Sequence, residues 1–167
     1  MSNNFFEIKN VDFKVGNKVK VKNVCFSIEN EGDIICLLGP SGIGKTTILR
    51  TIAGLENINK GSIELKGKIL SSEKTKIEPE NRNVSLAFQE NSLFPHYNVK
   101  KNILLGMERN KSKKKQPIRF EELIDLLDIS QILNKYPHEI SAGEAQRASL
   151  ARSLITQPDL LLLDEPL

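Results

Sequence analysis

The chain has 167 residues and a formal net charge of +3, and 39% of its residues are hydrophobic. This length supports one domain with a real core, and the composition is ordinary for a soluble globular protein. So small a charge gives no argument for nucleic-acid binding. The first residues show no secretory signal, and no apolar run approaches the ~18 residues that cross a bilayer, so we expect a cytoplasmic protein.

Two cysteines, Cys25 and Cys36, lie eleven positions apart without a CxxC pair or a His/Cys cluster. This spacing argues against a metal site. Cys36 falls within the apolar run at residues 34–38, and free cysteines are usually buried. We therefore expect both thiols to be buried.

The stretch IICLLGPSGIGKTT fits the pattern G-x-x-x-x-G-K-[ST]. Residues 34–38 predict a buried strand, and the apolar spacing of TTILRTIAGL predicts a helix that Gly54 would end. Glycines let backbone N–H groups face phosphate oxygens, Lys45 supplies a positive charge, and the Thr46 hydroxyl suits Mg²⁺. The alternative is a chance glycine loop between two elements. The pattern predicts a phosphate site formed by Gly39, Pro40, Ser41, Gly42, Ile43, Gly44, Lys45, Thr46 and Thr47.

Two carboxylates follow the leucine run at residues 160–163. An unbroken apolar run predicts a strand buried on both faces of a parallel sheet, and ligands of such sheets lie beyond the carboxyl ends of the strands. Asp164 would orient Mg²⁺, and Glu165 would act as general base on water attacking the γ-phosphate. Alternatively, both acids are solvated at a strand end.

With these motifs in place, the sequence resembles the ATP-binding subunits of ABC transporters. Gln89, in VSLAFQENSLFPH, matches the family's Q-loop glutamine, which reaches Mg²⁺ and the attacking water. ISAGEAQR matches the signature loop, and VKNVCFSIENEG and GSIELKGKIL resemble strands of the amino-terminal antiparallel β-layer. The resemblance implies Glu165 and Gln89 as catalytic residues, ATP and Mg²⁺ as ligands, and Thr46, Gln89 and Asp164 at the metal.

The signature stretch also has a local signal of its own. Ser141 and Glu144 fit S-x-x-E, a capping box that begins a helix with a packed stripe of Ala145, Ala148, Ala151 and Ile155. An ordinary capped helix without a ligand is the alternative. In the family, this helix start contacts the γ-phosphate held by a second subunit in a head-to-tail dimer. The resemblance therefore adds four residues to the nucleotide site: Ser141, Ala142, Gly143 and Glu144.

Several positions depart from the family pattern. Ala142 stands where the family usually has Gly, and Glu144 where Gln is common, so we expect a weaker contact in trans. Val15 stands where an aromatic residue usually stacks on adenine; Phe13 is a substitute or, alternatively, a core residue. The family continues beyond its Asp-Glu-Pro to a switch histidine, for which His96 and His138 cannot substitute, so we interpret the chain as truncated just after its Walker B motif.

The expected fold is α/β: a P-loop NTPase core with an amino-terminal antiparallel β-layer and an inserted helical subdomain, with the carboxyl-terminal part missing. Residues 1–167 would form one incomplete ABC-type ATP-binding domain. Within it, residues 1–89 are the β-layer and the P-loop part of the core, 90–145 are the helical subdomain with Q-loop and signature, and 146–167 return to the core sheet with Walker B.

The loop NSLFPHYN precedes a helix that Asn98 would cap, and in the family this region faces the membrane subunit. The alternative is burial of Leu93, Phe94, Pro95 and Tyr97 within their own domain. The resemblance implies an ATPase at the cytoplasmic face of the membrane, bound to integral permease subunits and a second ATPase subunit. An external solute-binding protein would act through the permease. The solute would be ferric iron, a polyamine, an inorganic anion or a sugar.

Two other functions stay open. The first is a soluble ABC-type ATPase of nucleic-acid metabolism, which would need a coiled-coil insertion, zinc CxxC pairs or tandem cassettes. The sequence shows none of these, so we expect no direct nucleic-acid partner. The second is a truncated remnant that only binds nucleotide.

Overall fold

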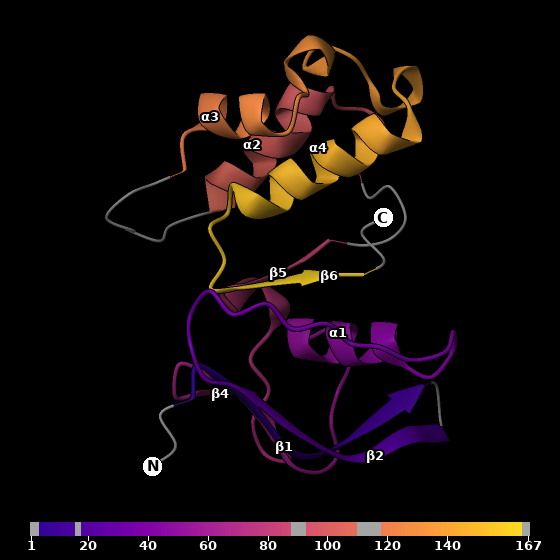
Figure 1. The fold of residues 1–167 in the computed structure, drawn as a ribbon, viewed down its shortest axis with the longest axis vertical. Coiled ribbons are helices and arrows are strands. Elements are labelled where there is room, and N and C mark those ends of the chain that lie inside the picture. Colours follow the sequence, from indigo (N-terminus) through magenta and orange to yellow (C-terminus); the bar gives the residue numbers. More distant parts are fainter. Residues whose placement is uncertain (1–3, 16–17, 88–92, 110–117, 165–167) are drawn as a thin grey trace. The chain divides into compact units, whose positions relative to one another are not determined.

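The computed structural model describes residues 4–15, 18–87, 93–109 and 118–164. The chain divides into two compact units, Met1–Arg82 and Asn83–Leu167 (Figure 1). Each unit has its own strands and helices, and each is described by itself.

A four-stranded antiparallel sheet forms much of the first unit. Its strands are β1 (Phe6–Val15), β2 (Lys18–Ile28), β3 (Ser62–Leu65) and β4 (Lys68–Ser72), in the order β2-β1-β3-β4. β1 is interior to the sheet, and its Phe6 pairs with Ile28 on one side and Leu65 on the other. The predicted antiparallel β-layer is confirmed.

A bulge in β1 lets its apolar side chains keep facing one core. Between Ile8 and Val11, β1 has one residue more than β2, and Asn10 takes a left-handed φ of 51°. An extra residue shifts the two-residue alternation of a strand. Phe6 and Ile8 are therefore buried before the bulge, and Val11 and Phe13 are buried after it.

Helix α1 (Lys45–Ala53) packs against β1 in the same unit. Gly54 ends the helix as predicted, with a left-handed φ of 91° that favours glycine. Its N–H donates to the Thr51 carbonyl at 3.0 Å, and the Leu55 N–H donates to the Arg50 carbonyl at 2.9 Å. These bonds satisfy carbonyls that the last turn would otherwise leave unpaired.

The predicted strand at residues 34–38 is not formed. Ile34 and Leu38 are 94% and 88% exposed, and none of the described strands pairs with this segment. A strand of a parallel sheet is held by hydrogen bonds to its neighbours, so apolar composition alone does not create one.

The second unit combines a two-stranded parallel sheet with helices. β5 (Val84–Ala87) pairs with β6 (Leu160–Leu163), with Val84 opposite Leu160 and Ala87 opposite Leu163. The helices are α2 (Val99–Arg109), α3 (Phe120–Leu126) and α4 (Ala142–Leu154). Short 3₁₀ turns lie at Ser130–Ile132 and Pro137–Glu139, and the first unit has another at Pro79–Asn81.

The leucine run at residues 160–163 forms the predicted strand in a parallel sheet, but burial on both faces was wrong. Leu162 is buried, whereas Leu163 is 39% exposed. In the part of the chain that the structure describes, β6 has β5 as its single neighbour. A strand with one neighbour is covered less completely than an interior strand.

The core of the second unit lies among the described helices α2, α3 and α4. Gly106 of α2 permits a close approach to α4, because a Cβ there would lie 2.7 Å from the Arg152 carbonyl oxygen. The buried cluster consists of Leu93, Val99, Ile103, Leu123, Ile124, Ile129, Ile132, Ala145, Ala148, Ala151 and Ile155. The α/β class and the helices between β5 and β6 agree with the expected fold, while the domain boundaries after residues 89 and 145 stay a prediction.

Candidate nucleotide-binding site

The glycine-rich loop takes a backbone conformation that needs glycine. Gly42 and Gly44 have φ angles of 75° and 115°, in the left-handed region. A Cβ on Gly44 would also lie 3.3 Å from Val21 Cγ2, whereas nothing lies within 4 Å of one on Gly42. Gly44 is thus required for conformation and space, and Gly42 for conformation alone.

Helix α1 begins at the end of this loop without a side-chain cap. Its N-cap is Gly44, and its first turn contains no acidic residue. The Ile48 N–H donates to the Gly44 carbonyl at 2.9 Å, which is the first bond of the helix ladder. The amino terminus therefore presents its positive dipole end without a carboxylate of its own, as an anion site requires.

The Lys45 side chain folds back over the loop. Its Nζ donates to the carbonyl oxygens of Gly39 at 2.8 Å and Pro40 at 3.2 Å. The Ile43 N–H closes the turn by donating to the Pro40 carbonyl at 3.3 Å. Because an ammonium binds an ionised phosphate more strongly than neutral carbonyls, these contacts leave Lys45 free to turn toward a phosphate.

The other predicted loop residues lie where a ligand could reach them. Ser41 and Thr46 are exposed, and the Thr47 carbonyl accepts a hydrogen bond from the Thr51 hydroxyl at 2.7 Å within α1. A loop that excludes side chains at Gly44 and places an ammonium across its own turn fits a polyphosphate. The Thr46 hydroxyl is a hard oxygen ligand of the type that Mg²⁺ takes.

In the second unit, Asp164 directly follows β6. It is 8% exposed, and its N–H donates to the Ala87 carbonyl at 3.1 Å. Because β5 and β6 are parallel, their carboxyl ends lie at one edge of the sheet, as predicted for Asp164. Glu165 and Gln89 lie outside the described residues, so their catalytic roles stay predictions.

The predicted capping box at the start of α4 is confirmed. Glu144 accepts hydrogen bonds from the Ser141 N–H at 2.8 Å and from its hydroxyl at 2.9 Å, and the Glu144 N–H donates to Ser141 Oγ at 3.3 Å. The backbone bond first, and then the hydroxyl bond, lowers the pKa of the Glu144 carboxyl below its ordinary value. The amino terminus of α4 thus already holds a negative charge.

The rest of the signature segment is helical and packs its apolar face into the core. Ala142 and Gly143 are the first two residues of α4, and the predicted stripe is buried. Arg147 lies one turn further, and a Cβ on Gly143 would be 3.9 Å from its Nη1. The Arg147 Nε is buried and has no hydrogen-bond partner among the described residues. A buried cationic donor of this kind favours a nearby anion.

Phe13 and the two cysteines differ in their exposure. Phe13 is 1% exposed, so its ring is a core residue and cannot stack on a base in this conformation. The prediction of buried thiols was wrong, because Cys25 and Cys36 are both exposed. Cys25 Sγ is hydrogen-bonded to Asn10, as acceptor from its N–H and as donor to its Oδ1, each at 3.2 Å.

Arg82 is a structural residue of the first unit that the sequence did not reveal. Its guanidinium is buried and donates to the carbonyls of Ile52 at 2.8 Å and Leu70 at 3.1 Å, and to Ser71 Oγ at 2.7 Å. Burial lowers its pKa, and the charge of Glu78 partly opposes this. Arg82 thereby joins the end of α1 to β4. No local pattern in NRN signals this role, since Ile52, Leu70 and Ser71 are remote from Arg82 in the sequence.

Asn102 is a buried polar residue that has a structural role in the second unit, as Arg82 has in the first. It binds residues 93–98, which we call the aromatic loop. It is buried; its Oδ1 accepts from the Phe94 N–H at 2.7 Å, and its Nδ2 donates to the carbonyls of Tyr97 at 3.0 Å and Asn98 at 3.1 Å. It holds the aromatic loop against α2, which Asn98 caps through the Lys101 N–H at 2.9 Å, as predicted. An amide on the apolar stripe of α2, beside Val99 and Ile103, was the available signal.

The aromatic loop borders a groove of about 500 Å³ within the second unit. Leu93 is buried in the core, whereas Phe94 is partly exposed and lies 5.5 Å from the Arg152 guanidinium, measured to its ring centroid. Burial lowers the pKa of Arg152. The groove is also lined by Tyr97, Leu105 of α2 and Leu86 of β5. The aromatic loop thus contributes Leu93 to the core and Phe94 to the surface.

Comparison with known proteins identifies the family. A family model described as "ABC transporter" matches residues 21–167, so the chain belongs to the ABC transporter family. It is 38% identical over 167 residues to the Fe(3+) ions import ATP-binding protein FbpC of Haemophilus influenzae, covering 99% of this chain and 47% of that protein.

Two other curated relatives are named for different solutes. Over 162 residues the chain is 43% identical to the spermidine/putrescine import ATP-binding protein PotA of Chromobacterium violaceum, covering 96% of this chain and 44% of that protein. Over 161 residues it is 41% identical to the sulfate/thiosulfate import ATP-binding protein CysA of Synechococcus elongatus, covering 96% and 45%. The chain spans less than half the length of these relatives.

Solved structures show the same fold. A nucleotide-free ATP-binding cassette from an ABC transporter matches with a TM-score of 0.79 and 22% identity, covering 98% of this chain and 70% of that chain. A dimeric post-hydrolysis cassette bound to ADP and Pi matches with a TM-score of 0.77 and 24% identity, covering 96% and 74%. The predicted ATP-binding cassette fold is therefore confirmed. None of the described helices is long and apolar enough to cross a membrane.

Proposed function

We propose that the chain is part of the ATP-binding and ATP-hydrolysing subunit that energises solute import through a membrane ABC transporter. The observation that carries the proposal is the glycine-rich loop. It combines left-handed glycines at positions 42 and 44, the Lys45 ammonium across the loop carbonyls, and a helix that begins without a side-chain cap. Such a loop holds the phosphates of ATP through backbone N–H groups and a mobile cation.

The roles of individual residues follow from their chemistry. Lys45 leaves the loop carbonyls and binds the outer phosphates. Thr46 and Asp164 would hold Mg²⁺, with Gln89 as a further oxygen ligand. The bound ion would neutralise phosphate charge and orient the outer phosphates. Glu165 accepts a proton from the water that attacks the γ-phosphorus.

A second ATPase subunit completes the site in this proposal. The start of α4, with Ser141, Ala142, Gly143 and Glu144, meets the γ-phosphate held by the partner of a head-to-tail dimer. Glu144 must yield its hydrogen bonds to Ser141 for the hydroxyl and N–H to reach that phosphate. This requirement makes the contact in trans weaker than an uncharged residue at position 144 would make it.

The groove at the aromatic loop supports a permease partner. Phe94 and Tyr97 present apolar rings, and Arg152 provides a cation at the groove wall. A short helix of an integral membrane subunit would bury an apolar side chain in this groove. The ATPase would then lie at the cytoplasmic face of the membrane, and an external solute-binding protein would act through the permease. The relatives named above support ferric iron, polyamines or inorganic anions as solutes; sugars are a further class.

The test uses the natural polypeptide that carries this sequence, reconstituted with its permease. Glu165→Gln should reduce ATP turnover roughly 10²- to 10⁴-fold, because the general base is lost, while ATP binding stays intact. Glu73→Gln, which changes the same charge at an exposed position, is the control. Equal turnover in Glu165→Gln and wild type would remove Glu165 from the base role.

A pull-down distinguishes a transport ATPase from an ATPase of nucleic-acid metabolism. We expect the tagged natural protein to co-purify with an integral membrane protein in detergent. Recovery with ribosomes or DNA at moderate salt would instead favour an ATPase of nucleic-acid metabolism.

A further inference from the structure

The start of α4 holds a cation as well as its capping carboxylate. Arg147 belongs to the second turn of the helix, yet its Nη1 would lie 3.9 Å from a Cβ on Gly143, in the first turn. The Arg147 Nε is buried and has no hydrogen-bond partner among the residues that the structure describes. Because a helix amino terminus carries positive potential, a cation beside it is unfavourable unless an anion is also present.

Arg147 is a helix neighbour of Glu144. The two residues are at positions i and i+3 of α4 and therefore share one face of the helix. The Ser141 bonds are the main cause of the lowered pKa of Glu144, and the charges of Lys135 and Arg147 lower it further. Within the described part of the chain, Glu144 is bonded to Ser141 and forms no ion pair with either cation. The carboxylate thus has a second partner nearby that it does not use in this conformation.

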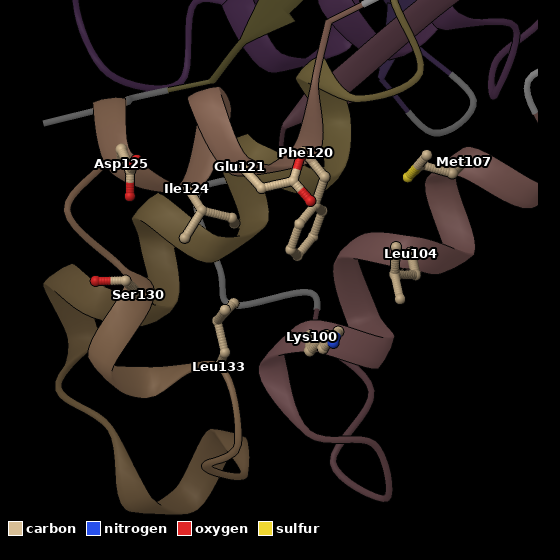
Figure 2. A pocket seen from close by; sticks show the side chains of 9 residues that line it. All are labelled: Lys100, Leu104, Met107, Phe120, Glu121, Ile124, Asp125, Ser130 and Leu133. Atoms are coloured by element: carbon tan, nitrogen blue, oxygen red, sulfur yellow. The ribbon is translucent and has the colours of Figure 1, made fainter.

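Other carboxylates of the second unit are directed elsewhere. Glu121 and Asp125 line a hollow between α2 and α3 (Figure 2). Glu139 accepts a hydrogen bond from a backbone N–H at 2.6 Å. Among the described residues, no carboxylate forms an ion pair with Arg147. Glu144, three residues before it on the same helix, is therefore the acid best placed to reach it.

The two arrangements of Glu144 exclude each other. While the carboxylate accepts from the Ser141 N–H and hydroxyl, it occupies donors that an anion at the helix start would need. A phosphate carries more charge and more acceptor oxygens than a carboxylate, so it can displace Glu144 from Ser141. The displaced carboxylate would then lie near a second anion, and like charges repel unless a cation neutralises one of them.

We propose that Arg147 is a positioning residue that receives the Glu144 carboxylate when a phosphate binds at the start of α4. The inference rests on the proposed function, because this phosphate is the one that the partner subunit holds. Without the ligand, Glu144 caps Ser141. With the ligand, Glu144 pairs with Arg147, and Ser141 donates to the phosphate. Arg147 acts through Glu144, so an uncharged residue at position 144 makes it dispensable for this step.

A double-mutant cycle tests this dependence in the natural full-length protein. Every sample carries Glu165→Gln to slow hydrolysis, and sedimentation in Mg²⁺ and ATP measures the dissociation constant of the dimer. Arg147→Gln should weaken the dimer about tenfold, because the displaced carboxylate is left without a charge-assisted partner. In a Glu144→Gln background, Arg147→Gln should weaken it less than about twofold, as for an independent position. Glu144→Gln alone should tighten the dimer.

Two further variants separate this role from a structural one. Arg119→Gln removes the same charge from an exposed position of the second unit and should leave the dimer unchanged in both backgrounds. Arg147→Lys keeps the charge with fewer donors, so its effect should be smaller than that of Arg147→Gln and should still require Glu144. If Arg147→Gln lowers the circular dichroism melting temperature, the Arg147→Lys pair replaces it in the cycle.

The outcomes distinguish this inference from the proposed function. Equal weakening by the Arg147 variants in the Glu144 and Gln backgrounds would show a structural role or a direct phosphate contact, and would overturn the inference alone. Failure of the Glu165→Gln protein to dimerise in Mg²⁺ and ATP would overturn the phosphate contact between subunits, and the inference with it.

Discussion

The two helices that the proposal sets beside phosphate begin in opposite ways. α1 starts at Gly44, with no side-chain cap and with the Lys45 ammonium over the loop. α4 starts at Ser141, whose N–H and hydroxyl both bind the Glu144 carboxylate. The first terminus thus offers positive potential to an incoming anion, whereas the second has neutralised part of its own.

The difference extends to how each helix is stabilised. α1 is held at its carboxyl end, by the Gly54 turn and by Arg82, which donates to the carbonyls of Thr51 and Ile52. α4 is held at its amino end by the capping box and along its length by its buried alanine stripe. Because α1 is stabilised at its carboxyl end, its amino-terminal N–H groups need no side-chain cap and can bind a ligand. At the amino terminus of α4, a ligand would compete with the Glu144 carboxylate for the Ser141 donors.

The largest effect should come from removing the Arg82 support of α1. Arg82→Met leaves buried carbonyl acceptors unpaired, and we expect a loss of roughly 2–4 kcal/mol in the free energy of unfolding. Urea unfolding followed by far-ultraviolet circular dichroism measures it, since the chain contains no tryptophan. Arg82→Lys keeps the positive charge but has fewer hydrogen-bond donors. Its free energy of unfolding should lie between those of the wild type and Arg82→Met. A loss below about 0.5 kcal/mol, typical of a surface change, would contradict this role.

At the open start of α1, Lys45→Ala should weaken ATP binding about 10- to 100-fold, because a charge-assisted bond to phosphate contributes about 1.5–3 kcal/mol. Titration with a fluorescent ATP analogue measures the affinity of the natural protein. Lys60→Ala removes the same charge from an exposed position and is the control. Equal affinities in the two variants would show that the loop cation does not bind nucleotide.

The loop glycines offer a paired test of the same terminus. Gly44→Ala should cost about 1–2 kcal/mol of unfolding free energy through left-handed strain, with a further loss from the Val21 contact. Gly42→Ala, at a left-handed φ of 75° and in open space, should show backbone strain without a steric contact. Urea titrations of both proteins measure the difference. A greater loss in Gly42→Ala than in Gly44→Ala would refute the steric part of the explanation.

The smallest effect concerns the capped start of α4 and depends on pH. The folded-state pKa of Glu144 is lowered by its bonds to Ser141, so its stabilisation is present above the ordinary glutamate pKa and is lost as pH falls through the lowered value. Glu144→Gln should flatten this acid dependence of thermal unfolding. Ser141→Ala removes the cap at every pH and should cost about 1 kcal/mol. An unchanged acid slope in Glu144→Gln would disprove the linkage.

Features formed by neighbours in sequence could be predicted from the sequence. The capping box at Ser141, the helix end at Gly54 and the cap at Asn98 each depend on hydrogen bonds that span only a few residues. The glycine-rich loop belongs to the same group, because its positive φ angles occur at glycines, which adopt them without steric cost. The antiparallel layer was also predictable, although from family resemblance rather than from local spacing.

The predictions that were wrong, and the structural residues that the sequence did not reveal, concern contacts between residues remote in the sequence. Residues 34–38 carry a strand-like composition, yet no described strand pairs with them. Cys25 is exposed although its residue type is usually buried.

The sequence alone therefore determined the glycine-rich loop before α1, the family of the chain and the caps of α1, α2 and α4, because these features depend on residues close together in the sequence. Only the tertiary structure decided that the buried Arg82 and Asn102 hold α1 and the aromatic loop in place. These outcomes depend on which distant backbone groups and side chains come within hydrogen-bonding or packing distance. No spacing along the chain encodes that information.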